Sequence, residues 1–270
     1  FENRRKLFPA VHAQFRFCLV AVSGRDTTIK KTDYGFFLET PEDLEDPERH
    51  FTLTSDELMM FNPNTGNCPT FRCRRDKVIA ETIYRRVPVL WKEAKDGQPE
   101  ENPWSIQFKS LFHMTNDSHL FRSREQLAAE GWKTVNNRWS KDDQWMVPLY
   151  EGKTLFLLDS RFGTYEGATQ EQLNTGQLPQ LTDNQHDDPW KLPQPGNWVD
   201  IDVVKERLSE QAFAVLCLRD ITNSTNQRTG IFAVSPWTAY GNNAPLIVFE
   251  DIDAQRDLPV LCTMLCSYAF

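Results

Sequence analysis

The chain has 270 residues, of which 40% are hydrophobic and 12% aromatic, a composition ample for the packed core of one large domain or two small ones. No apolar run approaches the roughly 18 residues that span a bilayer, and the first residues lack a signal-peptide pattern, so we expect a cytoplasmic protein without membrane contact. The formal net charge of -8 argues against nucleic-acid binding, because proteins that bind phosphates usually carry a basic surplus.

The charge is unevenly distributed along the chain. Between Glu39 and Glu57 eight acidic residues face one arginine, a net charge of -7. Between Arg72 and Lys92 seven basic residues face two acidic ones, a net charge of +5. A protein with segregated charge can be acidic overall and still present one basic surface. The net charge therefore does not exclude nucleic-acid binding.

The first hundred residues predict a small mixed region. The apolar run Phe15–Val22 and the segment Tyr34–Leu38 read as a strand pair joined by a polar linker. The stretch from Glu39 to Glu57 reads as an acidic surface loop. The charged segment Lys92–Pro103, which contains glycine and proline, predicts a boundary between two sub-domains.

The segment from Asp76 to Arg86 has the clearest helical pattern. Its less polar positions recur at spacings of three and four: Val78, Ile79, Thr82 and Ile83. We expect the helix to bury that side and to leave Lys77, Glu81 and Arg85 on the opposite side. The arginines at the two ends of this helix are candidates for phosphate contacts: Arg72, Arg74, Arg75, Arg85 and Arg86. The alternative is an ordinary solvated surface paired with the acidic loop.

The second region starts with strands and one short helix. Trp104–Phe112 is strand-like, and Ser123 with Gln126 forms a capping box that opens a helix through Glu130. Trp145–Tyr150 and Thr154–Asp159 predict a hairpin around the turn Glu151-Gly152-Lys153. In that turn Lys153 is a candidate for reading a guanine edge or contacting a phosphate, and an ordinary hairpin turn is the alternative.

The remaining elements complete a mixed architecture. The polar and proline-rich stretch Gln170–Gly196 predicts a long excursion without regular structure. A helix capped by Asp200 or Asp202 follows, then three strands and an apolar helix; their ranges are Asp200–Ser209, Ala212–Leu218, Gly230–Val234, Leu246–Phe249 and about Pro259 onward. The sequence as a whole predicts an α+β fold with mostly antiparallel strands and a few short helices.

A dense polar stretch, Arg219–Thr229, lies between two of these apolar strands. Arginine and asparagine side chains can pair with base edges through two hydrogen bonds, which makes four residues of this stretch candidate base readers: Arg219, Asn223, Asn226 and Arg228. Asn116, in the polar stretch Met114–His119, is a further candidate. For both stretches the alternative is a self-capping turn, since Asn, Asp, Ser and Thr are the usual turn residues.

Neither metal chemistry nor methyl transfer is expected within the segment. The six cysteines and five histidines match no metal-ligand spacing, and we interpret the cysteines, including Cys18 and Cys217 in apolar runs, as reduced core thiols. Asn62-Pro63-Asn64-Thr65 lacks the second proline and the aromatic ring of the adenine-gripping methyltransferase motif, so we interpret it as a turn. No glycine-rich loop for S-adenosylmethionine precedes it.

Several spaced motifs, taken in order, carry a resemblance that extends from residue 1 to about residue 250. They are Phe1–Pro9 with the apolar Phe15–Val22; Asn62–Thr65 leading into Arg75-Asp76 and Ile83–Pro88; Met114–Ser118; Val147–Lys153; and Arg219–Thr229. Their order resembles the region C-terminal to the catalytic domain in the Eco57I-like adenine-specific DNA methyltransferases of bacterial restriction-modification and phage-defence systems.

The resemblance implies a target-recognition role within a larger protein. Residues 1–95 would be a connector after a catalytic domain outside the segment, residues 96–250 the target-recognition domain, and residues 251–270 the start of an apolar helix that continues in the parent protein. The missing initiator methionine and the apolar final run Met264–Phe270 also predict an internal segment. The expected partners are double-stranded DNA and the catalytic domain of the same chain, where S-adenosylmethionine would bind.

A second function class remains open at this point. The acidic surface could instead bind a partner subunit, which would make the segment a non-catalytic protein-interaction or scaffolding module of a defence complex. The two functions differ in their response to salt, because DNA binding weakens steeply as salt rises.

Overall fold

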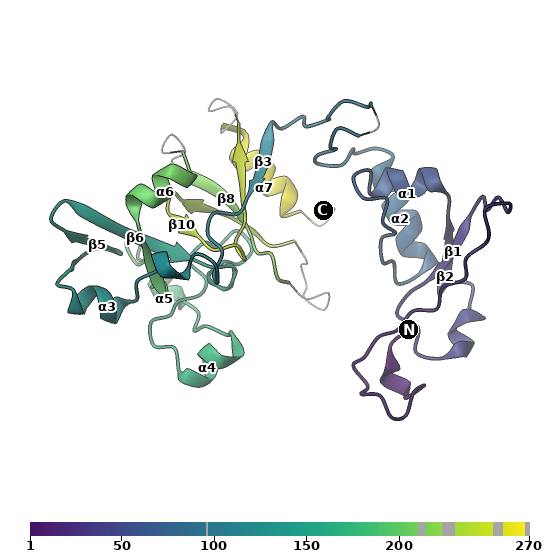
Figure 1. Cartoon of the computed structure of the whole chain (residues 1–270), viewed down its shortest axis with the longest axis horizontal. Helices are drawn as coiled ribbons and strands as arrows, with labels where there is room; N and C mark the ends of the chain where they lie inside the picture. Colours follow the sequence, from purple (N-terminus) through teal and green to yellow (C-terminus); the bar gives the residue numbers. More distant parts are fainter. Residues whose placement is uncertain (96, 210–213, 223–229, 251–255, 268–270) are drawn as a thin grey trace. The chain divides into compact units, whose positions relative to one another are not determined.

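A computed structural model describes residues 1–95, 97–209, 214–222, 230–250 and 256–267. The chain divides into two compact units, Phe1–Pro103 and Trp104–Phe270 (Figure 1). The division falls at the end of the Lys92–Pro103 segment, where the sequence suggested a boundary. Each unit has its own cluster of buried apolar side chains.

Among its described residues, the first unit contains one strand pair, two α-helices and two short 3₁₀ helices, Asn3–Arg5 and Pro41–Leu44. Strand β1 (Thr32–Gly35) pairs antiparallel with β2 (His50–Leu53), and helices α1 (Ser55–Phe61) and α2 (Arg74–Tyr84) follow. Helix α1 begins at a capping box, in which Thr54 accepts a hydrogen bond from the backbone N–H of Glu57 while the Glu57 carboxylate accepts one from that of Thr54. The core of the unit is formed by Phe51, Leu53 and Phe61.

The strand pairing corrects two sequence predictions. Phe15–Val22 does not pair with Tyr34–Leu38; Arg16 makes only an isolated bridge to Glu2, and Leu19, Val20 and Val22 are 73%, 75% and 87% exposed. Cys18 is likewise exposed rather than in the core. The partner of β1 lies inside the presumed acidic loop, because Phe51 and Leu53 alternate with Thr52 and so place two apolar side chains on one face of β2.

Helix α2 is confirmed, but its orientation differs from the prediction. Val78 and Ile79 are 52% and 49% exposed, while the Lys77 side chain is only 13% exposed. The inward side carries Lys77, bound to two carboxylates, together with the small Ala80, which packs against the core cluster, and Tyr84, whose ring contacts Phe61. A lysine whose charge is satisfied by neighbours can therefore take the inward position that the apolar pattern assigned to valine and isoleucine.

The second unit contains two sheets. The first has the strand order β10-β6-β5-β4, with β7 also pairing with β6, and the second has the order β3-β11-β8-β9. The strands are β3 (Ile106–Lys109), β4 (Lys133–Val135), β5 (Arg138–Lys141), β6 (Gln144–Tyr150), β7 (Asn197–Asp200), β8 (Ala214–Leu218), β9 (Phe232–Pro236), β10 (Ala239–Tyr240) and β11 (Leu246–Phe249). All pairs are antiparallel except β10 with β6, which confirms the predicted α+β class.

One buried cluster joins the two sheets. It contains Val147 and Leu149 of β6, Val215 and Cys217 of β8, and Leu246 of β11. Helix α6 (Ile201–Arg207) packs against β6 and β7, and α7 (Leu258–Leu265) packs against β9 and β8 (Figure 1). Because the central strands are held from several sides, the loops at their ends start from fixed positions.

Several local predictions in this unit are confirmed. Helix α3 (Arg124–Ala129) begins at the Ser123 capping box, and Asp200 caps α6 by accepting a hydrogen bond from the backbone of Asp202. Strands β8 and β9 pair antiparallel, so the Arg219–Thr229 stretch does connect two neighbouring strands. Asn62–Thr65 is a turn, as expected.

Two predictions in this unit are wrong. Thr154–Asp159 does not form the second strand of a hairpin; a single 3₁₀ turn (Gly152–Thr154) follows β6, because the Thr154 hydroxyl bonds to the Glu151 carbonyl and the Glu151 side chain turns inward. The Gln170–Gly196 stretch is not devoid of regular structure. It contains α4 (Gln170–Thr175) and α5 (Asp183–His186), each opened by a threonine capping box.

Candidate nucleic-acid interface

The exposed side of α2 gathers four of the five arginines proposed to contact phosphates. It consists of Arg74, Arg75, Val78, Ile79, Thr82, Arg85 and Arg86, all exposed, and we call it the α2 face. At 3.6 residues per turn these seven positions fall within about 140° of the helix circumference. The arginines form two pairs, one at each end of the helix, with Val78, Ile79 and Thr82 between them.

The arginines of this region differ in how their charges are balanced. Arg85 donates two hydrogen bonds, of 3.0 and 2.6 Å, to one carboxylate oxygen of Glu81. Arg72, just before the helix, lies with its guanidinium carbon 5.8 Å from the centre of the Phe37 ring. Arg74, Arg75 and Arg86 have no carboxylate partner among the described residues. Three uncompensated cations therefore remain on the α2 face.

On the inward side of α2, Lys77 forms ion pairs with two carboxylates of the same unit. The Lys77 ammonium donates hydrogen bonds of 2.7 Å to Glu57 and 2.6 Å to Glu81. Burial alone would raise the pKa of Glu57, but hydrogen bonds from Lys77 and Thr54 outweigh it and lower the pKa to about 2. With Arg85, which also binds Glu81, two cations and two carboxylates balance one another, so these groups are not available to an external ligand.

In the second unit, three loops meet around the turn Gly241–Asn243. The backbone N–H of Met114 donates to the Asn242 side chain at 2.9 Å, and that of Gly152 donates to the Asn243 side chain at 3.2 Å. The backbone N–H of Asp220 donates to the Asn243 carbonyl at 3.2 Å. We call these segments the Asn243 loop cluster: His113–Ser118, Glu151–Lys153, Arg219–Thr222 and Gly241–Asn243. It brings together three segments that the sequence nominated separately.

Lys153 is held by its neighbours within this cluster. Its ammonium lies 3.5 Å from a Glu151 carboxylate oxygen and 4.9 Å from the centre of the Tyr165 ring. Glu151 is buried, and the Tyr165 hydroxyl donates a hydrogen bond to its other oxygen. Burial and the Glu151 charge raise the pKa of Tyr165, which keeps that donor protonated. The Lys153 side chain retains 25% exposure, so only its end can reach a ligand.

Three glycines pack closely around this group. A Cβ atom added to Gly152 would lie 2.3 Å from the Asn243 carbonyl oxygen, and one added to Gly163 would lie 2.5 Å from that of Lys153. At Gly196 a Cβ would approach the Tyr165 ring to 2.9 Å. The backbone therefore fixes Glu151, Lys153 and Tyr165 in place. Sequence reasoning missed Tyr165 and Asn243, and the only sequence signal near them was the glycine after Glu151.

Asn116 sits in a loop that is ordered by its neighbour Asp117. The Asp117 carboxylate accepts two hydrogen bonds of 3.0 Å from Arg207 and one of 2.7 Å from the backbone of His113. These bonds lower the pKa of Asp117, with Arg207 as the main cause. Asn116 itself is exposed. The loop is thus a capped turn, as the structural alternative proposed, and it also presents one amide to solvent.

Of the polar stretch Arg219–Thr229, the structure describes the first four residues, Arg219–Thr222. Arg219 is half-buried, and its backbone N–H donates to the Ile231 carbonyl at 2.9 Å. Its Cγ atom lies 3.4 Å from the position of a Cβ added to Gly152, so Arg219 and Lys153 flank the same glycine. Asn223, Asn226 and Arg228 lie outside the described residues, and their proposed contacts with bases stay predictions.

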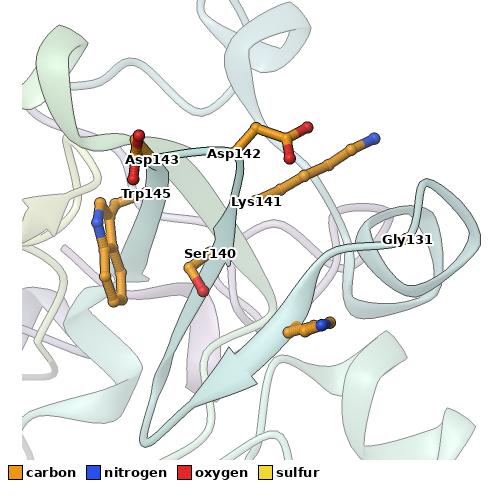
Figure 2. A pocket seen from close by; sticks show the side chains of 7 residues that line it. Gly131, Ser140, Lys141, Asp142, Asp143 and Trp145 are labelled. Atoms are coloured by element: carbon orange, nitrogen blue, oxygen red, sulfur yellow. The ribbon is translucent and has the colours of Figure 1, made fainter.

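A separate pocket of about 340 Å³ lies at the start of β6. Figure 2 shows the Trp145 indole beside Ser140, its partner across the β5–β6 pair, with Asp143 near them and Lys141 extending away. The Lys141 ammonium donates to the Glu130 carbonyl at 2.7 Å. The Asn243 loop cluster follows the other end of β6, which at about 3.3 Å per residue is roughly 20 Å away. The pocket is therefore no part of that cluster.

The described residues contain no group of three or more His, Cys, Asp or Glu side chains that could hold a metal ion, and no helix among them is long and apolar enough to cross a membrane. Comparisons with protein-family models, curated proteins and solved structures found no match. The geometry of the chain's own residues is therefore the basis for a functional assignment.

Proposed function

We propose that this chain binds double-stranded DNA as the target-recognition and clamping region of a larger adenine-N6 DNA methyltransferase in a bacterial restriction-modification or phage-defence system. The observation that carries the DNA-binding part is the α2 face. In a chain of net charge -8, it exposes Arg74, Arg75 and Arg86 without a carboxylate partner among the described residues. Uncompensated arginines release counterions when they meet phosphates, which is the main source of DNA affinity.

The first unit would supply phosphate contacts and the second unit would supply contacts to bases. The three arginines of the α2 face that lack a carboxylate partner among the described residues, Arg74, Arg75 and Arg86, would contact phosphates together with Arg72 and hold the protein on the duplex. The Asn243 loop cluster supports base reading because it presents Asn116, Arg219 and the end of Lys153 from an ordered frame. Asn223, Asn226 and Arg228 extend the same polar stretch in the sequence, and Arg and Asn side chains match guanine and adenine edges.

Methyl transfer would take place outside this segment. Asn62-Pro63-Asn64-Thr65 lacks the adenine-gripping residues, and its Asn64 amide donates to the Trp91 carbonyl at 3.1 Å, so the side chain serves the fold. We therefore expect S-adenosylmethionine to bind the parent protein and not the segment. Isothermal calorimetry of the segment with S-adenosylmethionine should give no heat of binding. Binding at micromolar affinity would show that the segment contains a cofactor site.

A second function is favoured by one specific observation. The exposed apolar residues Leu19, Val20 and Val22 could bury against another protein, as expected for an interaction module. Fluorescence anisotropy with a random-sequence duplex, measured over a series of salt concentrations, separates the two functions. DNA binding predicts an affinity that falls with salt at a log-log slope of about 0.9 per phosphate contacted. No measurable affinity at low salt would reject the DNA proposal and leave the interaction module.

A further inference from the structure

The centre of the α2 face is covered by methyl groups. Val78 and Ile79 are about half exposed, and Thr82 is exposed between them and the C-terminal arginines. The Thr82 hydroxyl donates a hydrogen bond of 2.8 Å to the Val78 carbonyl, so its methyl group is the part left to meet a ligand. The centre of the face therefore offers mainly apolar contact, and its one hydroxyl proton is already donated within the helix.

The arginine pairs stand at a defined separation on either side of this centre. Arg74 and Arg85, like Arg75 and Arg86, are eleven residues apart, which corresponds to about 16 Å along a helix that rises 1.5 Å per residue. A continuous row of phosphates would call for cations along the whole face. An apolar centre with a cation at each end instead suits a surface that is apolar in the middle and anionic at its borders.

The major groove of DNA has this composition. It is about 12 Å wide, which admits a helix, phosphates border it on both sides, and the C5-methyl group of each thymine projects into it. Among the side chains that read DNA directly, apolar ones make their specific contact with that methyl group. A protein partner with an apolar stripe and acidic ends is the other occupant to consider, and it predicts no dependence on the thymine methyl group.

We infer that α2 enters the major groove, where Val78, Ile79 and Thr82 contact thymine methyl groups while Arg74, Arg75 and Arg86 contact the bordering phosphates. This inference rests on the proposed DNA binding and adds to it. It makes α2 a contributor to sequence preference in favour of thymine, in addition to its electrostatic role. It also gives the outward-facing Val78 and Ile79 side chains a ligand to contact.

The test uses duplexes selected from a random pool for binding to the protein. Each selected duplex is compared with a version in which deoxyuridine replaces thymidine, which removes the methyl group and keeps the base pair. We expect the uracil duplex to bind roughly three- to five-fold more weakly for each methyl group contacted. The double variant Val78→Gln/Ile79→Gln should bind the two duplexes with nearly equal affinity. Leu44→Gln, at an exposed apolar site elsewhere in the first unit, should keep the wild-type ratio.

Equal affinities of the wild-type protein for the thymine and uracil duplexes would overturn the inference while leaving DNA binding intact, which is also the result expected if α2 binds a protein. Retention of the wild-type ratio by the Val78→Gln/Ile79→Gln variant would overturn it as well. Failure of the wild-type protein to bind any duplex would reject the proposed function itself. Thermal unfolding of each variant verifies that the exposed substitutions leave the fold intact.

Discussion

The α2 face and the Asn243 loop cluster both carry cations that the sequence nominated for DNA contacts, but the two regions hold them differently. Arg74 and Arg75 are exposed and have no carboxylate partner among the described residues. Lys153 lies between a buried carboxylate and an aromatic ring and keeps only a quarter of its side chain exposed. A basic residue in a polar stretch can therefore bind an external anion or stabilise the fold, and the groups around its side chain determine which of the two it does.

The largest expected effect concerns Gly152 in the Asn243 loop cluster. Gly152→Ala would place a methyl group 2.3 Å from the Asn243 carbonyl oxygen, so the turn or the Gly241–Asn243 segment has to move. We expect a loss of about 3 kcal/mol or more in the free energy of unfolding, measured by urea denaturation. Gly24→Ala is the matched control, because nothing lies within 4 Å of its added Cβ atom. Equal stability of the two variants would show that the turn is not closely packed.

The inner side of α2 predicts sensitivity to acid. The pKa of Glu57 is lowered from 4.5 to about 2 in the folded protein, so its contribution is complete above pH 4.5 and is lost as the pH falls toward 2. The contribution is of the order of 3 kcal/mol at most. Glu57→Gln should therefore be less stable than wild type at pH 7, and the difference should shrink between pH 4.5 and 2. A constant difference across that window would contradict the assignment.

The predicted base readers should affect preference and not stability. Replacing Asn226 or Arg228 with Ala should cost about 1–3 kcal/mol on the preferred site and relax the preference at one base pair. The measurements are the ratio of affinities for preferred and unrelated duplexes and the melting temperature of the same variants. A lowered melting temperature with an unaltered ratio would identify these residues as turn-forming only.

The sequence correctly predicted those helices and strands whose formation depends on residues close together in the chain. The capping box at Ser123, the Asp200 cap and the short apolar strands β8 and β11 depend on residues close in the chain. The wrong predictions concern features that depend on contacts between residues far apart in the sequence. The orientation of α2 depends on Glu57, which satisfies Lys77 from twenty positions away, and the pairing of β1 depends on Phe51 and Leu53.

The candidate sites show the same division. Residue type alone was enough to nominate Arg74, Arg75 and Arg86 as candidate phosphate contacts, because an exposed arginine needs no partner to act as a cation. The role of Lys153 could not be predicted, since it depends on its contact with Tyr165. The loops of the Asn243 loop cluster are joined by Asn242, which binds Met114, and by Asn243, which binds Gly152. Each of these pairs is more than 80 residues apart in the sequence. No periodicity in the sequence connects such positions.

The most direct test of the central claim is the salt dependence of DNA binding by the triple variant Arg74→Ala/Arg75→Ala/Arg86→Ala. Arg85→Ala is the matched control on the same helix, because Glu81 already binds that arginine. If the three uncompensated arginines contact phosphates, the log-log slope should fall by between about two and three in the triple variant and by clearly less than one in the control. A slope in the triple variant equal to that of the wild-type protein would contradict the account.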